Sequence, residues 1–370
     1  MRIGIVLDSL NRGGAERQAV YATGELARNG FDVELIYYNV ASFTYDASIL
    51  PPSNVVRLAK EGRQLRFLWM LQQYFRRRRF DVVHGWMSVP GIYTALAGRL
   101  AGIPVVFAGM RCEYDGAGMV QRAHRFINKS VTGWIVNSKA TVPSMVKGVG
   151  ADPSKVHVVY NGIDAAAFAS KLAKPEAKTN LGISPEAPTV SIIGRLRPQK
   201  NHALFIETAA LAAQRVSSAR FLVVGDGDGD EQQQLEALAD RLGIRGQILF
   251  LGSRSDIPDI LAATDVVMLT SHYEGVSNSL LEAMAVGLPV VSTAYAGVEE
   301  LITDGHDGLI APMGDAPALA AHISNLLLDS ELRKTLGDRG RQTIRERFSM
   351  PAMGKNLYAV YQNAFEAARK

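Results

Sequence analysis

Residues 266–292 read VVMLTSHYEGVSNSLLEAMAVGLPVVS, and the fold prediction starts from this stretch. The apolar run 266–269 is typical of a buried strand, residues 280–286 of a helix, and residues 289–292 of a second strand. A strand, a helix and a strand in that order form the unit from which parallel sheets covered by helices are built.

Short apolar runs alternate with helical stretches along the rest of the chain as well. The other predicted strands are residues 3–7, 33–38, 82–84, 105–108, 134–136, 156–159, 189–193, 221–224 and 248–251. Between residues 165 and 188 the alternation stops and Ala, Lys and Pro dominate, which predicts an interdomain linker. We therefore predict an α/β protein of two Rossmann-like, doubly wound domains, with the ligand site in the cleft between them.

The composition agrees with a two-domain globular protein, because the chain has 370 residues and is 47% hydrophobic and 21% charged. The single cysteine, Cys112, excludes an intramolecular disulfide. Together with the lack of an apolar run of about 18 residues, this predicts a soluble, cytoplasmic protein.

Residues 1–165 carry 20 Lys and Arg against 12 Asp and Glu. Such a basic part indicates an anionic partner (a phosphorylated substrate, a membrane surface or a nucleic acid) or an ordinary solvated surface.

Two loops contain residue types that bind phosphate. Gly13 and Gly14 follow the first strand, where paired glycines let backbone amides approach an anion at a helix N-terminus. A plain tight turn explains these glycines equally well. Arg195 and Lys200 lie in the loop 194–202 between a strand and a helix. Arg can bind a diphosphate bidentately and Lys as a point charge, and a solvated basic loop is the alternative.

The acidic loop 225–230, with the sequence GDGDGD, is not predicted to bind calcium. Counted from Asp226, an EF-hand needs Gly at position 6 and Glu at position 12, where this chain has Glu231 and Ala237. Acidic residues in front of the next helix favour its N-terminus, which explains the loop better. The sequence therefore predicts no metal site.

Glu274 and Glu282 form the strongest candidate site. Seven residues separate them, and a helix that starts near Val276 would place their carboxylates on the order of 10 Å apart. That distance is too large for two groups that share one proton. It suits two hydroxyl-bearing parts of a ligand whose diphosphate meets the helix N-terminus. Two solvated helix carboxylates are the alternative.

The motifs taken together resemble family 4 of the retaining glycosyltransferases, which have the GT-B fold. The resemblance rests on Glu274-x7-Glu282, on Gly194, Arg195 and Lys200, on Val224-Gly225-x-Gly227, on Gly13-Gly14 and on the turn Asn161-Gly162-Ile163-Asp164. These matches follow the family's order along nearly the whole chain. The resemblance implies an acceptor-side domain of residues 1–165 plus a returning helix at 350–370, and a nucleotide-sugar domain of residues 166–349.

The resemblance also implies roles for the site residues. Arg195 and Lys200 would stabilise the diphosphate leaving group, Glu274 would contact the donor sugar, and Glu282 would hold the ribose hydroxyls. The other donor contacts would come from Gly13, Gly14, Gly194, Gly225, Ser253, Arg254, Val276, Ser277, Asn278 and Ser279. The sugar would be transferred with retention at its anomeric carbon, from a donor that is expected to be a UDP-sugar, and without a metal or another cofactor.

One position departs from the family pattern. Many members carry His at the end of the strand that here runs from Pro104 to Ala108, and this chain has no His there. Arg111 is the nearest replacement, and His84 ends a different strand. The acceptor is expected to be a saccharide or a lipid-linked saccharide of cell-surface glycan synthesis. A nucleotide-sugar epimerase or a glucan synthase of the same fold is the alternative.

Two other classes of protein have less support. A nicotinamide-dependent dehydrogenase needs the Gly-x-Gly-x-x-Gly fingerprint and an acid at the end of the second strand, and both are absent. A nucleic-acid-binding protein would rest on the basic half alone, since no recognised module is present.

Residues 57–79 hold eight basic side chains and one acid, Glu61. Leu65, Leu68, Leu71 and Phe75, with Trp69 among them, are predicted to line one face of a helix that ends in Arg76–Arg79. Such a helix either lies on the anionic inner face of a membrane or packs on its own sheet.

Overall fold

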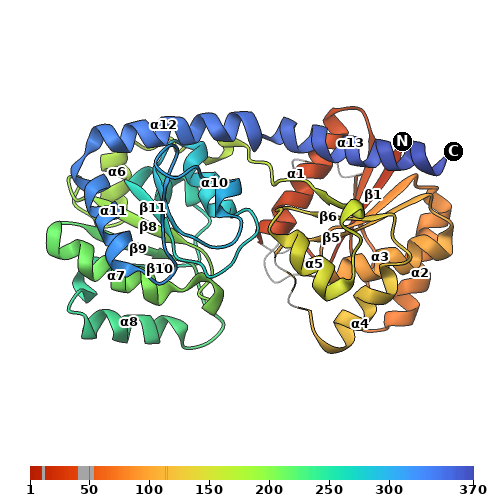
Figure 1. Cartoon of the computed structure of the whole chain (residues 1–370), viewed down its shortest axis with the longest axis horizontal. Coiled ribbons are helices and arrows are strands. Elements are labelled where there is room, and N and C mark those ends of the chain that lie inside the picture. Colours follow the sequence, from red (N-terminus) through yellow and green to blue (C-terminus); the bar gives the residue numbers. More distant parts are fainter. Residues whose placement is uncertain (11–12, 41–49, 51–53, 113, 115) are drawn as a thin grey trace. The chain divides into compact units, whose positions relative to one another are not determined.

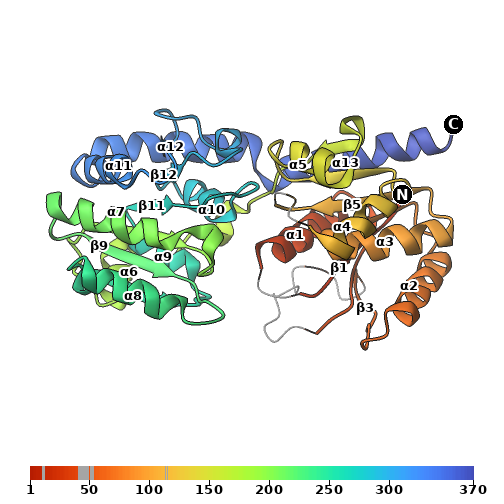
Figure 2. The same ribbon diagram turned by 60° about the horizontal axis from the view of Figure 1, so that its bottom comes forward.

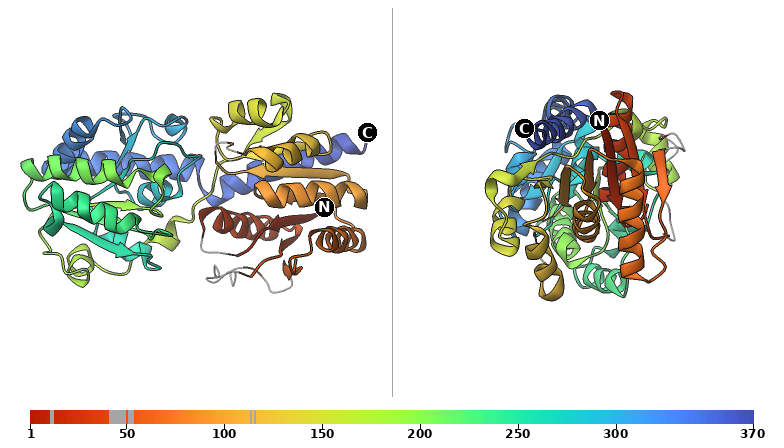
Figure 3. Two further views of the ribbon diagram at one scale, coloured as in Figure 1. Left: turned by 90° about the horizontal axis from the view of Figure 1, so that it is seen from below. Right: turned by 90° about the vertical axis from the view of Figure 1, so that its right-hand side faces the viewer.

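The computed structural model describes residues 1–10, 13–40, 50, 54–112, 114 and 116–370. Its contacts divide the chain into two compact units, unit 1 with Met1–Gly162 and Met350–Lys370, and unit 2 with Ile163–Ser349 (Figure 1). Each unit contains a parallel sheet flanked by helices (Figure 3). This architecture confirms the predicted fold class.

The sheet of unit 1 has, within the described residues, seven parallel strands in the order β3-β2-β1-β4-β5-β6-β7. These are β1 (Arg2–Leu7), β2 (Asp32–Tyr37), β3 (Val55–Arg57), β4 (Val82–Gly85), β5 (Val105–Met110), β6 (Gly133–Val136) and β7 (Val156–Val158). The helices are α1 (Gly14–Arg28), α2 (Gln64–Arg78), α3 (Ser88–Ala101), α4 (Gly118–Ile127), α5 (Thr141–Val149), α13 (Met350–Ala368) and the 3₁₀ turn η2 (Pro153–Lys155). Helix α1 packs against α13, whereas α2, α3, α4 and α5 form a second row, in which α2 lies beside α3 (Figure 2).

The strands of unit 1 are apolar on both sides because both faces of the sheet are covered. In β1, Ile3, Ile5 and Leu7 belong to the core cluster that includes α1 and α13. Val6 points the other way, into the cluster that includes α2. Successive side chains of a strand alternate between its two faces, so one short strand contributes to both cores.

The sheet of unit 2 has six parallel strands where the structure describes it, in the order β10-β9-β8-β11-β12-β13. These are β8 (Thr189–Ile193), β9 (Arg220–Val224), β10 (Ile248–Gly252), β11 (Val266–Leu269), β12 (Val290–Thr293) and β13 (Leu309–Ala311). The helices are α6 (Lys174–Asn180), α7 (His202–Arg215), α8 (Glu231–Arg241), α9 (Ile257–Ala263), α10 (Asn278–Ala285), α11 (Ala316–Leu328), α12 (Ser330–Arg347) and the 3₁₀ turns η3 (Ala165–Phe168), η4 (Pro198–Lys200), η5 (Arg245–Gln247) and η6 (Val298–Glu300).

The strand order of unit 2 reverses between β8 and β11. Chain connections leave β8 toward β9 on one side and leave β11 toward β12 on the other. In open parallel sheets, ligands bind beyond the carboxyl ends of the strands at such a reversal. The loops 194–202 and 270–277, which contain the strongest sequence motifs, both start at this point.

The predicted linker at residues 165–188 is wrong. It contains η3 and α6, and α6 packs on α9 inside unit 2. Pro175 lies in the first turn of α6, a position where its missing N–H costs little. Lys178 of the same helix is buried and donates to the carbonyl of Ala187 at 2.8 Å. The high content of Ala, Lys and Pro therefore reflects a short packed helix.

No helix among the described residues is long and apolar enough to cross a membrane.

Asp265 joins the start of the unit 2 sheet to α6. Its carboxylate lies 2.9 Å from the ammonium of Lys178 and 2.8 Å from that of Lys174, and it accepts from the amide of Thr189 at 2.9 Å. Burial acts to raise the pKa of Asp265, but the two lysines outweigh it and the pKa is lowered. The resulting stabilisation is fully present above the ordinary pKa and is lost as the pH falls through the lowered value.

We expect Asp265→Asn to lower the free energy of unfolding at neutral pH by about 3–5 kcal/mol, because it leaves a buried ammonium without its counter-charge. The advantage of the wild type over this variant should shrink as the pH falls below the ordinary Asp pKa. Urea unfolding across this pH range measures both effects. Lys174→Met is the matched control, since its side chain is 44% exposed and its loss should cost at most about 1 kcal/mol. Equal losses of unfolding free energy in the two variants would contradict the assignment of Asp265 as the counter-charge of a buried lysine.

Candidate active site

Hydrogen bonds join the loop after β8 to the loop after β11. The amide of His272 donates to the carbonyl of Gln199 at 2.8 Å. The side-chain amide of Gln199 donates in return to the carbonyl of Tyr273 at 2.7 Å. Two reciprocal bonds hold the loops together, and they bring Lys200 and Glu274 into contact although the two residues lie 74 positions apart in the sequence.

Lys200 and Glu274 form a partly buried ion pair at this junction. The ammonium of Lys200 lies 2.6 Å from Oε1 of Glu274, and the two side chains are 19% and 11% exposed. The hydroxyl of Ser271 donates to the same carboxylate oxygen at 2.7 Å. A Cβ at Gly194 would lie 3.3 Å from Cε of Lys200, so the glycine leaves room for the lysine stem. The site thus combines a cation and a carboxylate at the strand reversal.

Gly225 lets the loops after β8 and β9 approach each other closely. Its φ is +140°, and a Cβ there would lie 2.0 Å from the carbonyl oxygen of Gly194. The amide of Leu196 also donates to the carbonyl of Asp226 at 2.8 Å. Gly225, which the resemblance assigns to donor binding, therefore has a packing function in the structure.

Arg195 is paired with the acidic loop. Its guanidinium lies 2.6 Å from Oδ1 of Asp228, and that of Arg197 lies 3.9 Å from Oδ2. The sequence interpretation assigned the acids of this loop to the N-terminus of α8. For Asp228 this is corrected, because its carboxylate faces the arginines. The side chains of Arg195 and Asp228 are 50% and 71% exposed, so water screens this pair.

Helix α10 begins at Asn278, between the two starts considered from the sequence, Val276 and Leu280. Its N-cap residue, Ser277, makes no side-chain cap, and its hydroxyl lies 3.1 Å from that of Ser279. Val276 and Ser277 are buried. Glu282 lies in the second turn of α10 and is 5% exposed, which contradicts the alternative of a solvated helix carboxylate. The predicted residues of this segment are thus packed at the beginning of one helix.

Ser253 and Arg254 follow β10, which lies two strands from β8. Both residues are exposed. Arg254 binds Asp256 with two hydrogen bonds of 2.8 and 2.5 Å. The hydrogen bonds from Arg254 lower the pKa of Asp256, so the pair stays charged. At about 4.8 Å between neighbouring strands, these residues lie on the order of 10 Å from the start of the Lys200 loop.

Gly13 and Gly14 form the start of α1 in unit 1. Gly13 is the N-cap residue, and a Cβ there would collide with the Glu16 carboxylate, which lies over it. Burial raises the pKa of Glu16. Asn11 and Arg12 of the predicted loop lie outside the described residues.

His84 and Arg111, the two candidates for the acceptor side, have different surroundings in unit 1. His84 is fully buried, and its Nδ1 lies 2.7 Å from the hydroxyl of Tyr361 on α13. Burial, with the nearby charge of Arg111, holds the pKa of His84 well below its usual value. His84 therefore packs inside unit 1 against α13 and exposes no surface in the structure.

Arg111 lies at the carboxyl end of β5 and is partly exposed. Its guanidinium carbon lies 3.6 Å from the centre of the Trp86 ring, a cation–π contact. Burial lowers its pKa to about 9, so it remains charged at neutral pH. Of the two acceptor-side candidates, Arg111 is the one that is charged at neutral pH, and its Nη2 is buried without a hydrogen-bond partner among the described residues.

Two residues of this region were not among the sequence candidates. Ser271 donates to Glu274, and the Ser-x-x-Glu spacing, whose ends meet in a tight turn, was the available signal. Tyr295 follows β12 and is 1% exposed, and its hydroxyl has no hydrogen-bond partner among the described residues. Burial, and next the charge of Glu274, raise the pKa of Tyr295 well above its usual value. Sequence alone contains no signal for Tyr295, because its position depends on the fold.

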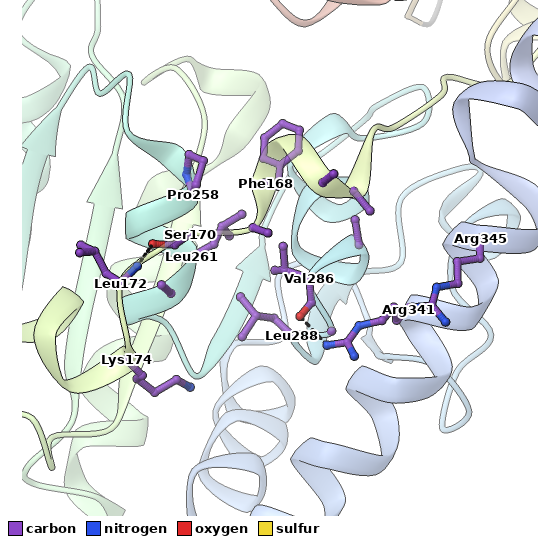
Figure 4. A pocket seen from close by; sticks show the side chains of 16 residues that line it. Phe168, Ser170, Leu172, Lys174, Pro258, Leu261, Val286, Leu288, Arg341 and Arg345 are labelled. Atoms are coloured by element: carbon purple, nitrogen blue, oxygen red, sulfur yellow. Dashed lines mark hydrogen bonds between the residues drawn. The ribbon is translucent and has the colours of Figure 1, made fainter.

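A groove of about 640 Å³ lies elsewhere on unit 2, between η3, α9, the end of α10 and α12 (Figure 4). Its walls are mostly apolar, and Arg341 reaches across one side to the carbonyl of Val286 at 2.8 Å. None of the predicted site residues lines it. The described part of the chain also contains no group of three or more His, Cys, Asp or Glu placed to hold a metal ion.

Two family models match the chain. One, described as Glycosyltransferase Family 4, matches residues 12–167, and one described as Glycosyl transferases group 1 matches residues 173–343. A relative from Escherichia coli, UDP-Gal:alpha-D-GlcNAc-diphosphoundecaprenol alpha-1,3-galactosyltransferase, is 30% identical over 68% of this chain and 68% of its own length. The lipopolysaccharide core biosynthesis glycosyltransferase LpsE of Rhizobium meliloti is 35% identical over 48% of this chain and 50% of its own.

Solved structures are similar over the whole chain. HepE of Anabaena in complex with UDP-glucose has a TM-score of 0.85 at 22% identity and matches 98% of this chain and 100% of its own. WaaG, a glycosyltransferase involved in lipopolysaccharide biosynthesis, has a TM-score of 0.72 at 18% identity, with 99% of each chain matched. At these identities the likeness establishes the fold, and it confirms the GT-B prediction.

The close contact between Gly225 and Gly194 generates a structural prediction. We expect Gly225→Ala to lower the free energy of unfolding by about 1–3 kcal/mol, because its backbone is strained for an L-residue and its Cβ meets a carbonyl oxygen. Gly227→Ala in the same motif is the control. Its Cβ would meet only the Glu231 side chain, closest at the carboxylate end, which can rotate away, so about 0.5 kcal/mol or less is expected. Urea unfolding that ranks the two variants in the reverse order would refute this packing role.

Proposed function

Because the chain belongs to glycosyltransferase family 4, we propose that it transfers a hexose or N-acetylhexosamine, with retention at the anomeric carbon, from a UDP-sugar to a saccharide acceptor. The acceptor we propose is a saccharide, free or lipid-linked, of cell-surface glycan synthesis. The observation that supports the proposal is the pair of hydrogen-bonded loops at the strand reversal, in which Lys200 contacts Glu274 four residues before the start of α10.

The donor would lie across the carboxyl ends of the strands of unit 2. Its sugar would meet Glu274 and its diphosphate would lie between Lys200, Arg195 and the first turn of α10. Glu282 lies four residues after the start of α10, about 6 Å along the helix, where the ribose would follow. The base would then point toward the residues after β10, Ser253 and Arg254. The loops that would meet the sugar, the diphosphate and the base follow β11, β8 and β10, in that order along the sheet edge.

Both proposed phosphate-binding cations are paired with carboxylates, Lys200 with Glu274 and Arg195 with Asp228. A diphosphate would exchange places with these partners as it binds. Negative charge grows on the diphosphate as the bond to the sugar breaks, so cations held in place stabilise the transition state more than the bound donor. In the front-face reaction proposed for this family, the leaving diphosphate takes part in deprotonating the acceptor hydroxyl, so the protein mainly orients the reactants.

Two comparisons support the choice of donor and acceptor class. The relative from Escherichia coli uses UDP-Gal and a GlcNAc-diphosphoundecaprenol acceptor, according to its name. The similar Anabaena structures hold UDP, UDP with glucose, and UDP-glucose. An epimerase or a glucan synthase of the same fold is the second candidate. Analysis of the products formed without and with a saccharide acceptor separates these activities.

The two glutamates should affect binding and turnover differently. Glu282→Ala should weaken UDP and the UDP-sugar about equally, by roughly ten- to a hundredfold, since a bond to a charged group contributes about 1.5–3 kcal/mol. Glu274→Ala should leave UDP affinity nearly intact and instead lower kcat and relax discrimination among donor sugars. Calorimetry of both variants with both ligands measures the difference. If Glu274→Ala lost UDP affinity as strongly as Glu282→Ala, the two ends of the donor would be assigned wrongly.

We also propose that α2 binds an anionic membrane surface at the inner face of the membrane. Of the predicted apolar face, Leu71 and Phe75 are buried in unit 1 and Leu68 packs beside them, which agrees with the alternative that the helix packs on its own domain. The prediction is corrected for Leu65 and Trp69, which lie outside this buried face. Leu65 and Trp69, one helical turn apart, are 83% and 61% exposed. They form an outer apolar stripe that the buried face does not explain.

The basic end of α2 also divides into two groups. Arg78 pairs with the buried carboxylate of Glu34, so it is part of the fold. Arg76, Arg77 and Arg79 are exposed. Helix α4, in the same row, exposes Met119, which is 84% exposed, and Phe126, which is 68% exposed. Exposed apolar and basic side chains on one row of helices suit an interfacial contact with anionic lipid.

Flotation with phosphatidylglycerol vesicles at low salt tests this surface. Changing Arg76, Arg77 and Arg79 to Ser should weaken binding by up to about a hundredfold, since each contributes about 1 kcal/mol near an anionic surface. Trp69→Ser should also weaken it. Leu328→Ser in unit 2 is the control, because Leu328 is 65% exposed and Trp69 is 61% exposed. Wild-type protein that does not float, or arginine variants that float as well as wild type, would exclude the proposal.

A further inference from the structure

The carboxylate of Glu274 is held by two donors of different kinds. Oε1 accepts from the ammonium of Lys200 at 2.6 Å and from the hydroxyl of Ser271 at 2.7 Å. Ser271 is 1% exposed, whereas the side chain of Lys200 is 19% exposed. One donor is thus a charged group near the surface, and the other is a neutral group in the interior.

Thr293 holds the backbone of Ser271 in place through a hydrogen bond. Its hydroxyl donates to the carbonyl of Ser271 at 2.7 Å, and its side chain is 1% exposed. Thr293 is the last residue of β12, which pairs with β11 just before Ser271, through Leu269 and Ser292. The chain of bonds from Thr293 through Ser271 to Glu274 therefore connects the carboxylate to the ends of two neighbouring strands.

The two donors respond differently to an anion. A diphosphate competes for the ammonium of Lys200, because charge-assisted bonds to phosphate are strong. The Ser271 hydroxyl carries no net charge and has one proton, which it already donates to Glu274. When the diphosphate of the sugar nucleotide binds Lys200, the hydrogen bond from Ser271 to Oε1 of Glu274 remains.

We propose that Ser271, fixed by Thr293, is a positioning residue that keeps the Glu274 carboxylate oriented toward the donor sugar while Lys200 is engaged by the diphosphate. This inference rests on the proposed function, in which Glu274 meets the sugar and Lys200 the diphosphate. Ser271 touches neither the donor nor the acceptor in this assignment. Its contribution is to limit rotation of the Glu274 carboxylate. Because the rate of transfer depends on the orientation of the groups around the sugar, this rotation would lower kcat.

The test compares Ser271→Ala with Ser271→Thr in transfer assays and in calorimetry with UDP. Ser271→Ala should lower kcat by about ten- to a hundredfold, the effect of losing a hydrogen bond to a charged group. Its Kd for UDP should stay within about twofold of wild type, since UDP lacks the sugar that Glu274 contacts. Ser271→Thr keeps the hydroxyl and should recover most of the kcat.

Ser191→Ala is the matched control for the loss of a buried hydroxyl. Ser191 is fully buried in β8, and its hydroxyl lies 2.5 Å from that of Thr264, away from Glu274. It should lose stability but keep kcat. Thr293→Val, which removes the hydroxyl at nearly constant volume, should lower kcat in the same direction as Ser271→Ala, and Thr293→Ser should restore it.

A double-mutant cycle separates positioning from general damage. In a Glu274→Ala background, Ser271→Ala should change kcat by less than about twofold, because the group it positions is gone. A kcat for Ser271→Ala equal to that of Ser191→Ala, or additive losses in the cycle, would overturn this inference and leave the proposed function intact. A wild-type chain that transfers no sugar from any UDP-sugar would overturn the proposed function and this inference together.

Discussion

The ion pair between Lys200 and Glu274 is the interaction on which the site depends. It forms because β8 and β11 are neighbours at the strand reversal, and their loops are bonded to each other through Gln199. Two opposite charges this close to the interior are stable only while each has the other or a ligand to replace it. In the proposed function, the diphosphate would replace Glu274 as the partner of Lys200, and the hydroxyl groups of the sugar would bond to Glu274.

Two glycines and the acidic loop 225–230 allow the backbone around the ion pair to pack closely. Gly194 leaves space for the lysine stem, and Gly225 leaves space for the carbonyl of Gly194. Asp228 holds Arg195 in the exposed part of the loop. The motif residues of the loops after β8 and β9 thus depend on one another, and each glycine is needed where a side chain would displace a neighbour.

The parallel fold and most strands could be predicted from the sequence, because apolar runs and helical periodicity are local signals. Strands β3 and β13, with three residues each, were missed, since so short a run forms a strand only through its pairing with β2 or β12. The false linker arose for a similar reason, because α6 packs on α9, a contact that the local sequence does not indicate. In the site, Glu274 and Lys200 could be named from motifs. The contact between these two residues could not be predicted, because the order of the strands in the sheet decides which loops lie next to each other. The burial of His84 likewise depends on Tyr361, 277 residues away.

The contact between His84 and Tyr361 also constrains how the chain reaches its native state during synthesis. The core around β1 and β4 includes Met350, Met353, Leu357 and Tyr361 of α13. All residues of unit 2 leave the ribosome before that helix, so unit 2 has every contact of its own sheet available first. Unit 1, although its strands are translated earliest, keeps an apolar face uncovered until α13 has been translated. The portion that is made first is thus the last to be completed.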